Sequence, residues 1–399
     1  MTKGPGISRT PLPKGFKAGG VNSGVRKYRP DLGLVMSEKD ATCVAVYTQN
    51  KCKAAPITYC QSILPSKHIR AIVTNSGQAN AATGEQGRTT NFQMASAISK
   101  TLGCLPHQVA TASTGVIGKQ LEIEKIEAAS QDLVNQLNDY CETFSLAILT
   151  TDLTPKAVSM EIPLTQGTVR LTGISKGSGM IHPNMATMLG YLITDCDLAP
   201  DVAQSILLQA TNDSFNMISV DGDSSTNDCV FLMANGASGV KLTNDNDWIA
   251  MKKAVLEVSQ ELAKAIARDG EGAQKLIEVT LTGLTDDTLA RKAARGITLS
   301  PLIKTAIHGE DPNWGRILAR LGAEGIFEAQ LSKMKLSIQG TPVFADGAPV
   351  SFDVIALRQA LKSDTVLIKA EFQESNSTTV TAWGCDLTKR YVEINIDYN

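Results

Sequence analysis

The chain has 399 residues, of which 43% are hydrophobic and 20% are charged, and its formal net charge is −2. This composition is typical of a globular protein and excludes collagen-like, disordered and coiled-coil chains. The small net charge also argues against binding to nucleic acid or to an acidic membrane through a basic surface. The length allows either two domains of ordinary size or one large layered domain.

Eight cysteines are scattered along the chain without a C-x-x-C pair, which gives no support to a zinc ribbon or a dense disulfide framework. We expect free thiols in a reducing compartment. The segment 1–15 is rich in Gly and Pro and lacks both the apolar core of a signal peptide and the pattern of a transit helix. No run approaches the roughly 20 apolar residues of a membrane span. The sequence therefore predicts a cytoplasmic protein.

The first part of the chain alternates strand-like and helix-like segments. A short apolar strand begins at Arg70 and breaks into a small-residue loop at 75–84. The next segment, 91–103, has Met94, Ile98 and Leu102 on one helical face. A strand that runs into a glycine-rich turn follows at 109–118. Helical spacing then returns at four apolar positions: Ile123, Ile126, Leu133 and Leu137.

Period-two patterns dominate the middle of the chain and predict strands at 144–152, 157–163 and 168–177. The alternation of strand and helix then resumes. We expect, in order, a strand at 187–195, a helix at 201–215, a strand at 228–236 and a long helix from Trp248 to about Arg268. These segments indicate a mixed α/β fold in which several neighbouring strands are antiparallel.

Most familiar catalytic patterns are absent from the sequence. It has no G-x-S-x-G nucleophile elbow, and "STGVIGKQ" lacks the spacing and the Ser/Thr of a phosphate-binding loop. The acidic segment 221–228, "DGDSSTND", could bind a cation, but a polar turn between strands is the commoner explanation. Few bases are available for a serine triad, because the chain has only four histidines: His68, His107, His182 and His308.

Threonine chemistry needs no histidine. An N-terminal threonine can use its own α-amine as the general base, since that amine has a pKa of about 7.7 to 8.0. In "KGSGMIHPNMATML", residues 176–189, a loop of glycine and proline meets an apolar strand at Thr187. Cleavage of the Ala186–Thr187 bond would create such a terminus. From these residues alone, an ordinary loop entering a core strand is the more common explanation.

The same segment resembles the self-cleavage segment of the bacterial ornithine acetyltransferases, also called glutamate N-acetyltransferases, of arginine biosynthesis. Further blocks resemble this family in the family's order and cover nearly the whole chain. They are "PKGFKAGGVNSGV", "VYTQNKCKAAPI", "VTNSGQANAATG", "STGVIGK", "TTDLTPK", "SVDGDSSTNDCV", "ARDGEGAQKLIE", "PLIKTAIHGEDPNWGRI" and "YVEINIDY". Together they make the resemblance specific.

The resemblance implies a self-processing enzyme. Thr187 would attack the Ala186 carbonyl and divide the chain into an α chain, 1–186, and a β chain, 187–399. The freed Thr187 amine would then activate the Thr187 hydroxyl to take the acetyl group from N2-acetylornithine. Glutamate would accept that group from the acetyl-threonine intermediate.

Further roles carried over from the family concern the oxyanion and the substrates. Thr114, through its hydroxyl, and Gly115, through its backbone N–H, would form the oxyanion hole. Substrate contacts would come from Thr150 or Thr151, Lys176, Thr187, Glu271 and Asn395. At the C-terminal end, either Asn399 replaces a family Thr or Ser that helps to bind the substrate, or that contact is absent. We expect Lys176 to pair with the substrate α-carboxylate and Glu271 to pair with the distal ammonium of ornithine.

The resemblance also implies a layered α/β/β/α sandwich in which the two fragments share one core and assemble into a heterotetramer or a larger species. We expect no metal and no cofactor, and the sequence does not decide whether acetyl-CoA is a second acetyl donor. Leu153 and Ala82 depart from the family pattern. Two alternatives remain open: an N-terminal-threonine aminopeptidase or amidase, and a non-catalytic protein on the same scaffold.

Overall fold

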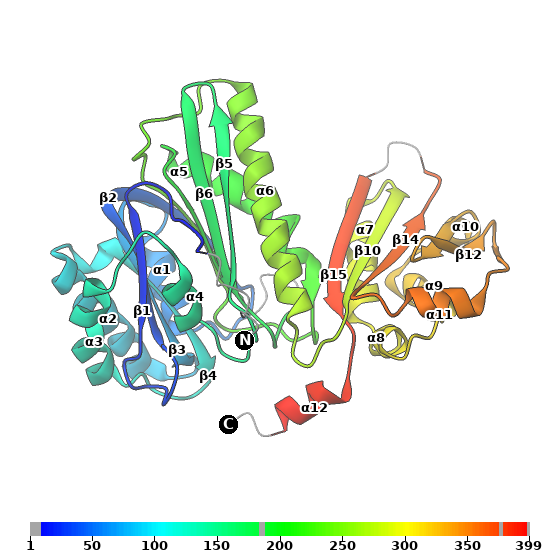
Figure 1. The fold of residues 1–399 in the computed structure, drawn as a ribbon, viewed down its shortest axis with the longest axis horizontal. Coiled ribbons are helices and arrows are strands. Elements are labelled where there is room, and N and C mark those ends of the chain that lie inside the picture. Colours follow the sequence, from blue (N-terminus) through cyan, green and yellow to red (C-terminus); the bar gives the residue numbers. More distant parts are fainter. Residues whose placement is uncertain (1–8, 183–187, 375–377, 397–399) are drawn as a thin grey trace, which may run out of the picture. The chain divides into compact units, whose positions relative to one another are not determined.

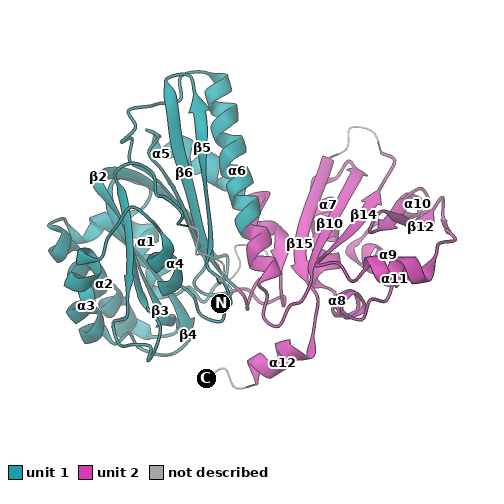
Figure 2. Cartoon of the chain, viewed as in Figure 1, with its two compact units in different colours: residues 1–177, 187–211, 225–262 teal, residues 178–186, 212–224, 263–399 magenta. Residues whose placement is uncertain are grey.

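The computed structural model describes residues 9–182, 188–374 and 378–396 (Figure 1). The chain divides into two compact units (Figure 2). Unit 1 comprises 1–177, 187–211 and 225–262, and unit 2 comprises 178–186, 212–224 and 263–399. Each unit is built on its own β-sheet.

The sheet of unit 1 has eight strands in the described part of the chain, in the order β4-β3-β2-β9-β7-β6-β5, with β1 paired to β2. Their bounds are β1 (Phe16–Val21), β2 (Leu32–Tyr47), β3 (Ser66–Gln78), β4 (Val109–Val116), β5 (Lys156–Leu164), β6 (Gly167–Lys176), β7 (Leu189–Thr194) and β9 (Cys229–Ala234). The pairs β3·β4 and β7·β9 are parallel, whereas β2·β9, β5·β6 and β6·β7 are antiparallel.

Both faces of this sheet are covered by apolar packing. Ile72 and Val73 are neighbours in β3 but belong to two different hydrophobic clusters, and successive strand residues point to opposite faces. One cluster includes residues of α1 (Ala55–Ile63) and α4 (Glu142–Ala147), and the other includes residues of α2 (Gly84–Leu102) and α3 (Ile123–Asn135). The central strands β7 and β9 are buried along their whole length.

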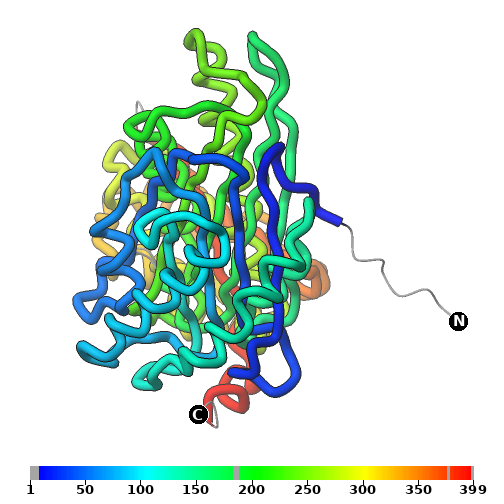
Figure 3. The backbone as a smooth tube through the Cα atoms, turned by 90° about the vertical axis from the view of Figure 1, so that its left-hand side faces the viewer, coloured from blue at the N-terminus to red at the C-terminus, as the bar shows by residue number. Residues whose placement is uncertain are grey.

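The long helix α6 (Asp245–Arg268) runs beside the β5–β6 hairpin (Figures 1 and 3). Glycine is required where α6 meets β6, because a Cβ at Gly173 would lie 2.4 Å from a methyl carbon of Val258 and 2.8 Å from one of Leu262. The helix α5 (Pro200–Asn212) follows β7 in the chain. Short 3-10 helices lie at Pro106–Gln108, in unit 1, and at Phe215–Met217, in unit 2.

The sheet of unit 2 has seven strands among the described residues, in the order β13-β12-β11-β14-β10-β15-β8. They are β8 (Ile218–Ser219), β10 (Leu276–Leu284), β11 (Lys335–Ile338), β12 (Thr341–Ala345), β13 (Ala348–Pro349), β14 (Thr365–Glu371) and β15 (Thr378–Cys385). The helices of this unit are α7 (Asp287–Leu299), α8 (Pro301–His308), α9 (Trp314–Glu324), α10 (Glu328–Leu331), α11 (Val354–Ala360) and α12 (Lys389–Asn395).

The mixed α/β fold expected from the sequence is confirmed, with two sheets and helices in both units. The strand predicted at 144–152 is wrong, because helix α4 occupies Glu142–Ala147. Phe144, Ala147 and Ile148 are buried there while Leu146 is exposed. This is the spacing of one helix face, which a short apolar run does not distinguish from a strand.

The sequence also predicts free thiols and no membrane-spanning segment. The eight cysteines, all within the described residues, are free thiols as expected. Within the described ranges, no helix combines the length and the apolar character that crossing a bilayer requires.

Candidate active site

Thr114 and Gly115 stand at the end of β4, where the parallel partner strand β3 approaches closely. Thr114 is buried. Gly115 has a φ of +129°, and a Cβ at this position would lie 2.4 Å from the carbonyl carbon of Gly77 and 2.7 Å from the nitrogen of Gln78. Both observations require glycine at position 115. The predicted oxyanion-hole residues therefore lie at a point where the backbone conformation is tightly specified.

The buried side chain of Lys176, the last residue of β6, connects two other predicted site residues. Its ammonium donates hydrogen bonds to Thr150 Oγ1 at 2.9 Å and to Thr114 Oγ1 at 3.3 Å. An ammonium group only donates, so each threonine accepts from Lys176 and directs its own hydroxyl hydrogen elsewhere. The Thr114 hydroxyl hydrogen is thereby directed away from Lys176, as the predicted oxyanion-hole role would require.

The carboxylate of Asp152 lies near the Lys176 ammonium and carries the opposite charge. One Asp152 carboxylate oxygen is 2.8 Å from Lys156 Nζ and accepts the N–H of Gly177 at 2.7 Å. The other oxygen accepts the N–H of Thr150 and is 3.9 Å from Lys176 Nζ. Burial by itself would raise the pKa of Asp152, but the two lysines and these hydrogen bonds hold it well below its usual range. The carboxylate is therefore charged.

Of the two threonines that the sequence left open, Thr150 is the one whose hydroxyl accepts from Lys176. Thr151 is the next residue in the same loop and is partly buried. The departure at Leu153 is 80% exposed, so this side chain contributes little to packing around Lys176. The structure thus brings Thr114, Thr150 and Lys176 together within unit 1.

Unit 2 holds the second group of predicted substrate contacts. The Glu271 carboxylate is buried and accepts a hydrogen bond from the Asn395 side chain, in α12, at 2.8 Å. Gly179 allows this position, because a Cβ there would lie 2.4 Å from the Glu271 carboxyl carbon. The Glu271 N–H also donates to the carbonyl of Ser178 at 3.0 Å. Glu271 and Asn395 are therefore brought together.

The residues on which the predicted self-cleavage depends are only partly described. Ala186 and Thr187, and also Asn399, lie outside the described residues. The flank that precedes the cleavage point is held in unit 2, where Asp221 accepts the N–H groups of Met180 at 2.6 Å and Ile181 at 2.9 Å. His182 in this flank is partly buried, and its Nδ1 is 3.4 Å from Ser219 Oγ. Burial lowers its pKa.

The flank that follows the cleavage point is held in unit 1. The N–H of Met188 donates to Asp228 Oδ1 at 3.0 Å, and the Met188 carbonyl accepts the N–H of Cys229 at 3.3 Å. Asp228 is fully buried, and burial raises its pKa well above the usual range, although the Met188 N–H, nearby Ser225 groups and Lys176 oppose this shift. None of the described residues forms a hydrogen bond of good geometry with Asp228 Oδ2.

Sequence reasoning missed three acidic residues around these groups: Asp152, Asp221 and Asp228. Asp152 could have been suspected, because its block also contains Thr150 and Thr151. The other two belong to the acidic segment 221–228, which we interpreted as a polar turn. Their carboxyl groups in fact accept backbone N–H groups of the 176–189 segment.

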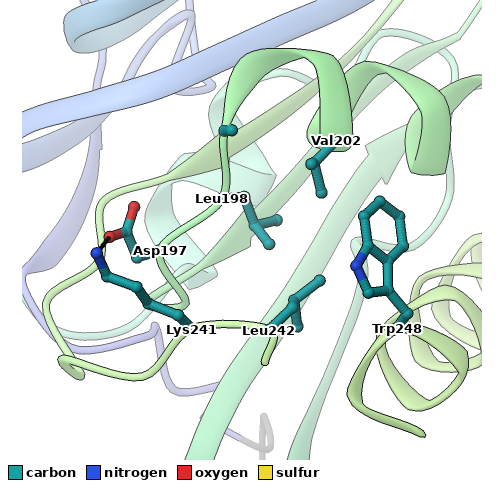
Figure 4. Close-up of a pocket in the computed structure, with 7 residues that line it drawn as sticks. Asp197, Leu198, Val202, Lys241, Leu242 and Trp248 are labelled. Carbon is teal, nitrogen blue, oxygen red and sulfur yellow. Dashed lines mark ion pairs between the residues drawn. The ribbon is translucent and has the colours of Figure 1, made fainter. Parts of the chain in front are cut away.

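A pocket of about 240 Å³ lies elsewhere in unit 1 (Figure 4). Asp197 and Lys241 form an exposed ion pair of 3.2 Å at its edge, and Leu198, Val202, Leu242 and Trp248 contribute apolar surface. Lys176 pairs with Leu189 at the first residue of β7, whereas Asp197 follows the last residue of that strand. The pocket is therefore at the other end of β7 from the site around Lys176.

Comparisons with known proteins assign this chain to a family. Residues 17–399 match the ArgJ family. The Arginine biosynthesis bifunctional protein ArgJ of Oceanobacillus iheyensis is 43% identical over 389 residues, which are 97% of this chain and 95% of the relative. The protein of the same name from Synechococcus is 43% identical over 400 residues, with 97% of this chain and 96% of the relative covered.

Among solved structures, the crystal structure of the Arginine biosynthesis bifunctional protein argJ of Bacillus halodurans matches with 41% sequence identity and a TM-score of 0.51. The match covers 53% of this chain and 100% of that chain. Because the sequence matches extend over nearly the full length of both partners, the chain belongs to the ArgJ family.

Proposed function

We propose that this chain is a self-processing acetyltransferase of arginine biosynthesis, which moves an acetyl group from N2-acetylornithine to glutamate through an acetyl-threonine intermediate. The observation that carries the proposal is the buried Lys176 ammonium, which donates to the hydroxyls of Thr114 and Thr150. It stands on the strand that pairs with β7, and β7 begins two residues after the predicted nucleophile. The names of the curated relatives point to the same pathway.

In the proposed reaction, the α-amine of Thr187 takes the proton of the Thr187 hydroxyl as the oxygen attacks the acetyl carbonyl. The C–N bond to ornithine then breaks, and the amine returns the proton to the leaving nitrogen. The negative charge that develops on the carbonyl oxygen is stabilised by the Thr114 hydroxyl and the Gly115 N–H. Glutamate reverses these steps and leaves acetylated.

Charge complementarity supports the proposed substrate contacts. Lys176 would bind the α-carboxylate, with Thr150 or Thr151 beside it. The Glu271 carboxylate is buried in unit 2 next to the Asn395 amide, and it would bind the distal ammonium of ornithine. Asn399 would supply a further polar contact. Both charged residues are scarcely exposed, and burial strengthens the attraction between opposite charges.

The proposed cleavage is compatible with the arrangement of strands in unit 1. A break after Ala186 would leave β6 in the α chain and β7 in the β chain, but the two strands pair along six residues of each. The length of the matched Bacillus halodurans chain also supports the proposed cleavage. The complete Bacillus halodurans chain corresponds to 53% of this chain, and residues 187–399 are 213 of the 399 residues, which is also 53%.

The proposal also includes the cofactor requirement, the location, a second reaction and the assembly of the enzyme. We expect the reaction to need no cofactor and no metal, and to take place in the cytoplasm. The relatives are named bifunctional, so we include acetyl transfer from acetyl-CoA to glutamate as a second reaction. Pairs of α and β chains would associate into a heterotetramer or a larger species.

Denaturing intact-mass measurement tests the processing step. We expect wild type to give two chains, beginning at Met1 and Thr187, and Thr187→Ala to give one chain of full length. A wild-type protein that is active but uncleaved would refute the mechanism. Mass spectrometry of the β chain after brief exposure to N2-acetylornithine should also find one acetyl group on Thr187.

Incubation with N2-acetylornithine, with and without glutamate, tests the transfer step. We expect N-acetylglutamate and ornithine when glutamate is present and little release of acetate when it is absent. Acetate release that is fast and independent of glutamate would identify an amidase instead. A third reaction, with acetyl-CoA and glutamate, decides whether the second activity exists.

A further inference from the structure

The acidic segment 221–228 supplies none of the proposed catalytic or substrate-binding groups, yet its two terminal aspartates contact both flanks of the segment that is predicted to be cut. Asp221 accepts two N–H groups from the preceding flank, those of Met180 and Ile181. Asp228 accepts the N–H of Met188, which follows the predicted nucleophile. Each of these contacts lies within one unit.

We propose that Asp221 and Asp228 are positioning residues for self-cleavage, which hold the backbone on either side of the Ala186–Thr187 bond. The inference rests on the proposed function, because it assumes cleavage at this bond. An intramolecular attack depends strongly on how well the reacting groups are oriented. The contacts of the two aspartates orient the described residues nearest to this bond, Met180 and Ile181 before it and Met188 after it.

On the preceding flank, Asp221 holds a strained backbone. Met180 has a φ of +58°, a conformation that a residue with a side chain rarely adopts. The two Asp221 oxygens bind consecutive N–H groups there, and the Ile181 carbonyl accepts the N–H of Val220 at 2.8 Å. Because both oxygens are used, an asparagine at position 221 would lose one acceptor.

On the following flank, both backbone groups of Met188 are held, the N–H by Asp228 and the carbonyl by Cys229. The amide of Asn227 anchors this part of the chain by donating to the carbonyls of Ala79 at 2.6 Å and Ser113 at 2.8 Å. Ser113 immediately precedes Thr114. The anchor of the following flank is thus attached to the same strand end that carries the predicted oxyanion hole.

Asp228 uses only one oxygen for Met188, and its other oxygen forms no hydrogen bond of good geometry within the described residues. An asparagine can place its carbonyl where Oδ1 stands, so Asp228→Asn should keep the contact with Met188. Leucine has a similar size but no acceptor, so Asp228→Leu should lose it. The two aspartates therefore differ in how they tolerate asparagine.

Asp221 and Asp228 should also differ in their importance for the processed enzyme. Met180 and Ile181 would belong to the α chain and be separated from the nucleophile, whereas Met188 would remain bonded to Thr187. Loss of the Asp221 contacts should therefore slow processing but leave the turnover of processed enzyme nearly unchanged. Loss of the Asp228 contact should impair both.

The test measures the rate of cleavage after synthesis of each full-length precursor, by denaturing intact mass, and then kcat of the processed enzyme. Asp223→Asn is the matched control, because it removes a charge from the same segment at an exposed residue. We expect roughly tenfold slower cleavage for Asp221→Asn and for Asp228→Leu, as for loss of a hydrogen-bond partner that is partly or fully buried. Asp228→Asn and Asp223→Asn should stay within about threefold of wild type.

The outcomes separate this inference from the proposed function. An uncleaved wild type overturns both. If wild type is cleaved and Asp221→Asn, Asp228→Leu and the control are all cleaved at equal rates, only the positioning role is overturned. Should Asp228→Leu fail to fold, Asp221→Asn against Asp223→Asn still decides, because equal rates for those two variants contradict the inference.

Discussion

Two buried aspartates of unit 1, Asp152 and Asp228, show how neighbours decide the charge of a carboxyl group. Asp152 is held by Lys156 at 2.8 Å and by two backbone N–H groups, and its pKa is lowered. Asp228 accepts one backbone N–H and its pKa is raised well above the usual range. Burial favours the neutral acid in both, and only around Asp152 is that effect outweighed.

The difference between the two aspartates has a consequence for the candidate site. Formal charges around Lys176 are two positive lysines, Lys156 and Lys176, and one negative carboxylate, Asp152. A neutral Asp228 leaves one positive charge in excess, which favours an anionic substrate. A charged Asp228 would cancel that excess. Substitutions at and around the two aspartates test this contrast.

Replacement of the two aspartates by asparagine tests the contrast directly. Asp152→Asn leaves two buried lysine ammonium groups without their carboxylate, so the free energy of unfolding should fall by about 3 to 5 kcal/mol. Asp228→Asn replaces a carboxyl group that binds a proton on folding at pH 7, so it should leave the free energy of unfolding unchanged or raise it. Urea denaturation at pH 7 measures both values. Equal losses for the two variants would contradict the assigned charges.

Substitutions of Thr114, which accepts a hydrogen bond from Lys176, test its proposed role in the oxyanion hole. Thr114→Ala removes one proposed oxyanion donor and should lower kcat by a factor of about 10² to 10³. Thr114→Ser keeps the hydroxyl that accepts from Lys176 and should recover most of the activity. Steady-state kinetics with N2-acetylornithine and glutamate provide both values, and a Thr114→Ala enzyme of normal kcat would exclude Thr114 from the oxyanion hole.

The pH dependence of stability should have opposite signs at the two aspartates. Asp152 has a lowered pKa, so its contribution is present above the ordinary carboxyl value of about 3.9 and is lost as the pH falls below it. Asp228 has a raised pKa and binds a proton on folding, so it makes the protein less stable as the pH rises from about 4 toward its folded value.

Asparagine at either position removes the corresponding dependence. Relative to wild type, Asp228→Asn should gain stability between pH 5 and pH 8, by at most roughly 1.4 kcal/mol for each pH unit. The deficit of Asp152→Asn should shrink below pH 4. Urea denaturation series of the three proteins measure these differences, and a pH-independent difference for Asp228→Asn would mean that Asp228 is charged.

A control is provided by Leu153, which departs from the family pattern next to Asp152. Its side chain is 80% exposed, so Leu153→Thr should change the free energy of unfolding by less than about 0.5 kcal/mol. It should also leave KM for N2-acetylornithine unchanged. A substantial change in KM would show that the Leu153 side chain affects substrate binding. The charges of Asp152 and Asp228 would then not suffice to explain the preference for an anionic substrate.

Much of the fold could be predicted from sequence periodicity. The central strands β7 and β9 and the helix α6 follow clear apolar patterns, because they are buried against a core along most of their length. The strand predicted at 144–152 is wrong, since the buried residues Phe144 and Ile148, four positions apart, fit either periodicity over so short a run. The spacing of apolar residues distinguishes a helix from a strand only when the segment is long enough to contain several repeats of that spacing.

The candidate site was predictable in part. The family resemblance identified Thr114 and Lys176, and the structure brings them together. The states of Asp152 and Asp228 could not be read from the sequence, because both residues stand in polar loops of similar composition. Burial raises the pKa of Asp228, whereas Lys176 and Lys156 lower the pKa of Asp152 against the effect of burial, and only the folded sheet creates these two environments.

The sheet of unit 1 mixes strands from both sides of the proposed cut. β6 pairs with β7, and β2 pairs with β9, so each predicted fragment would supply neighbours to the other. The precursor could fold as a single chain, but the processed protein could unfold fully only by dissociation into two chains. Its melting temperature would then rise more steeply with protein concentration than that of Thr187→Ala, whose two halves stay in one chain. Processing would convert a folding equilibrium into a binding equilibrium.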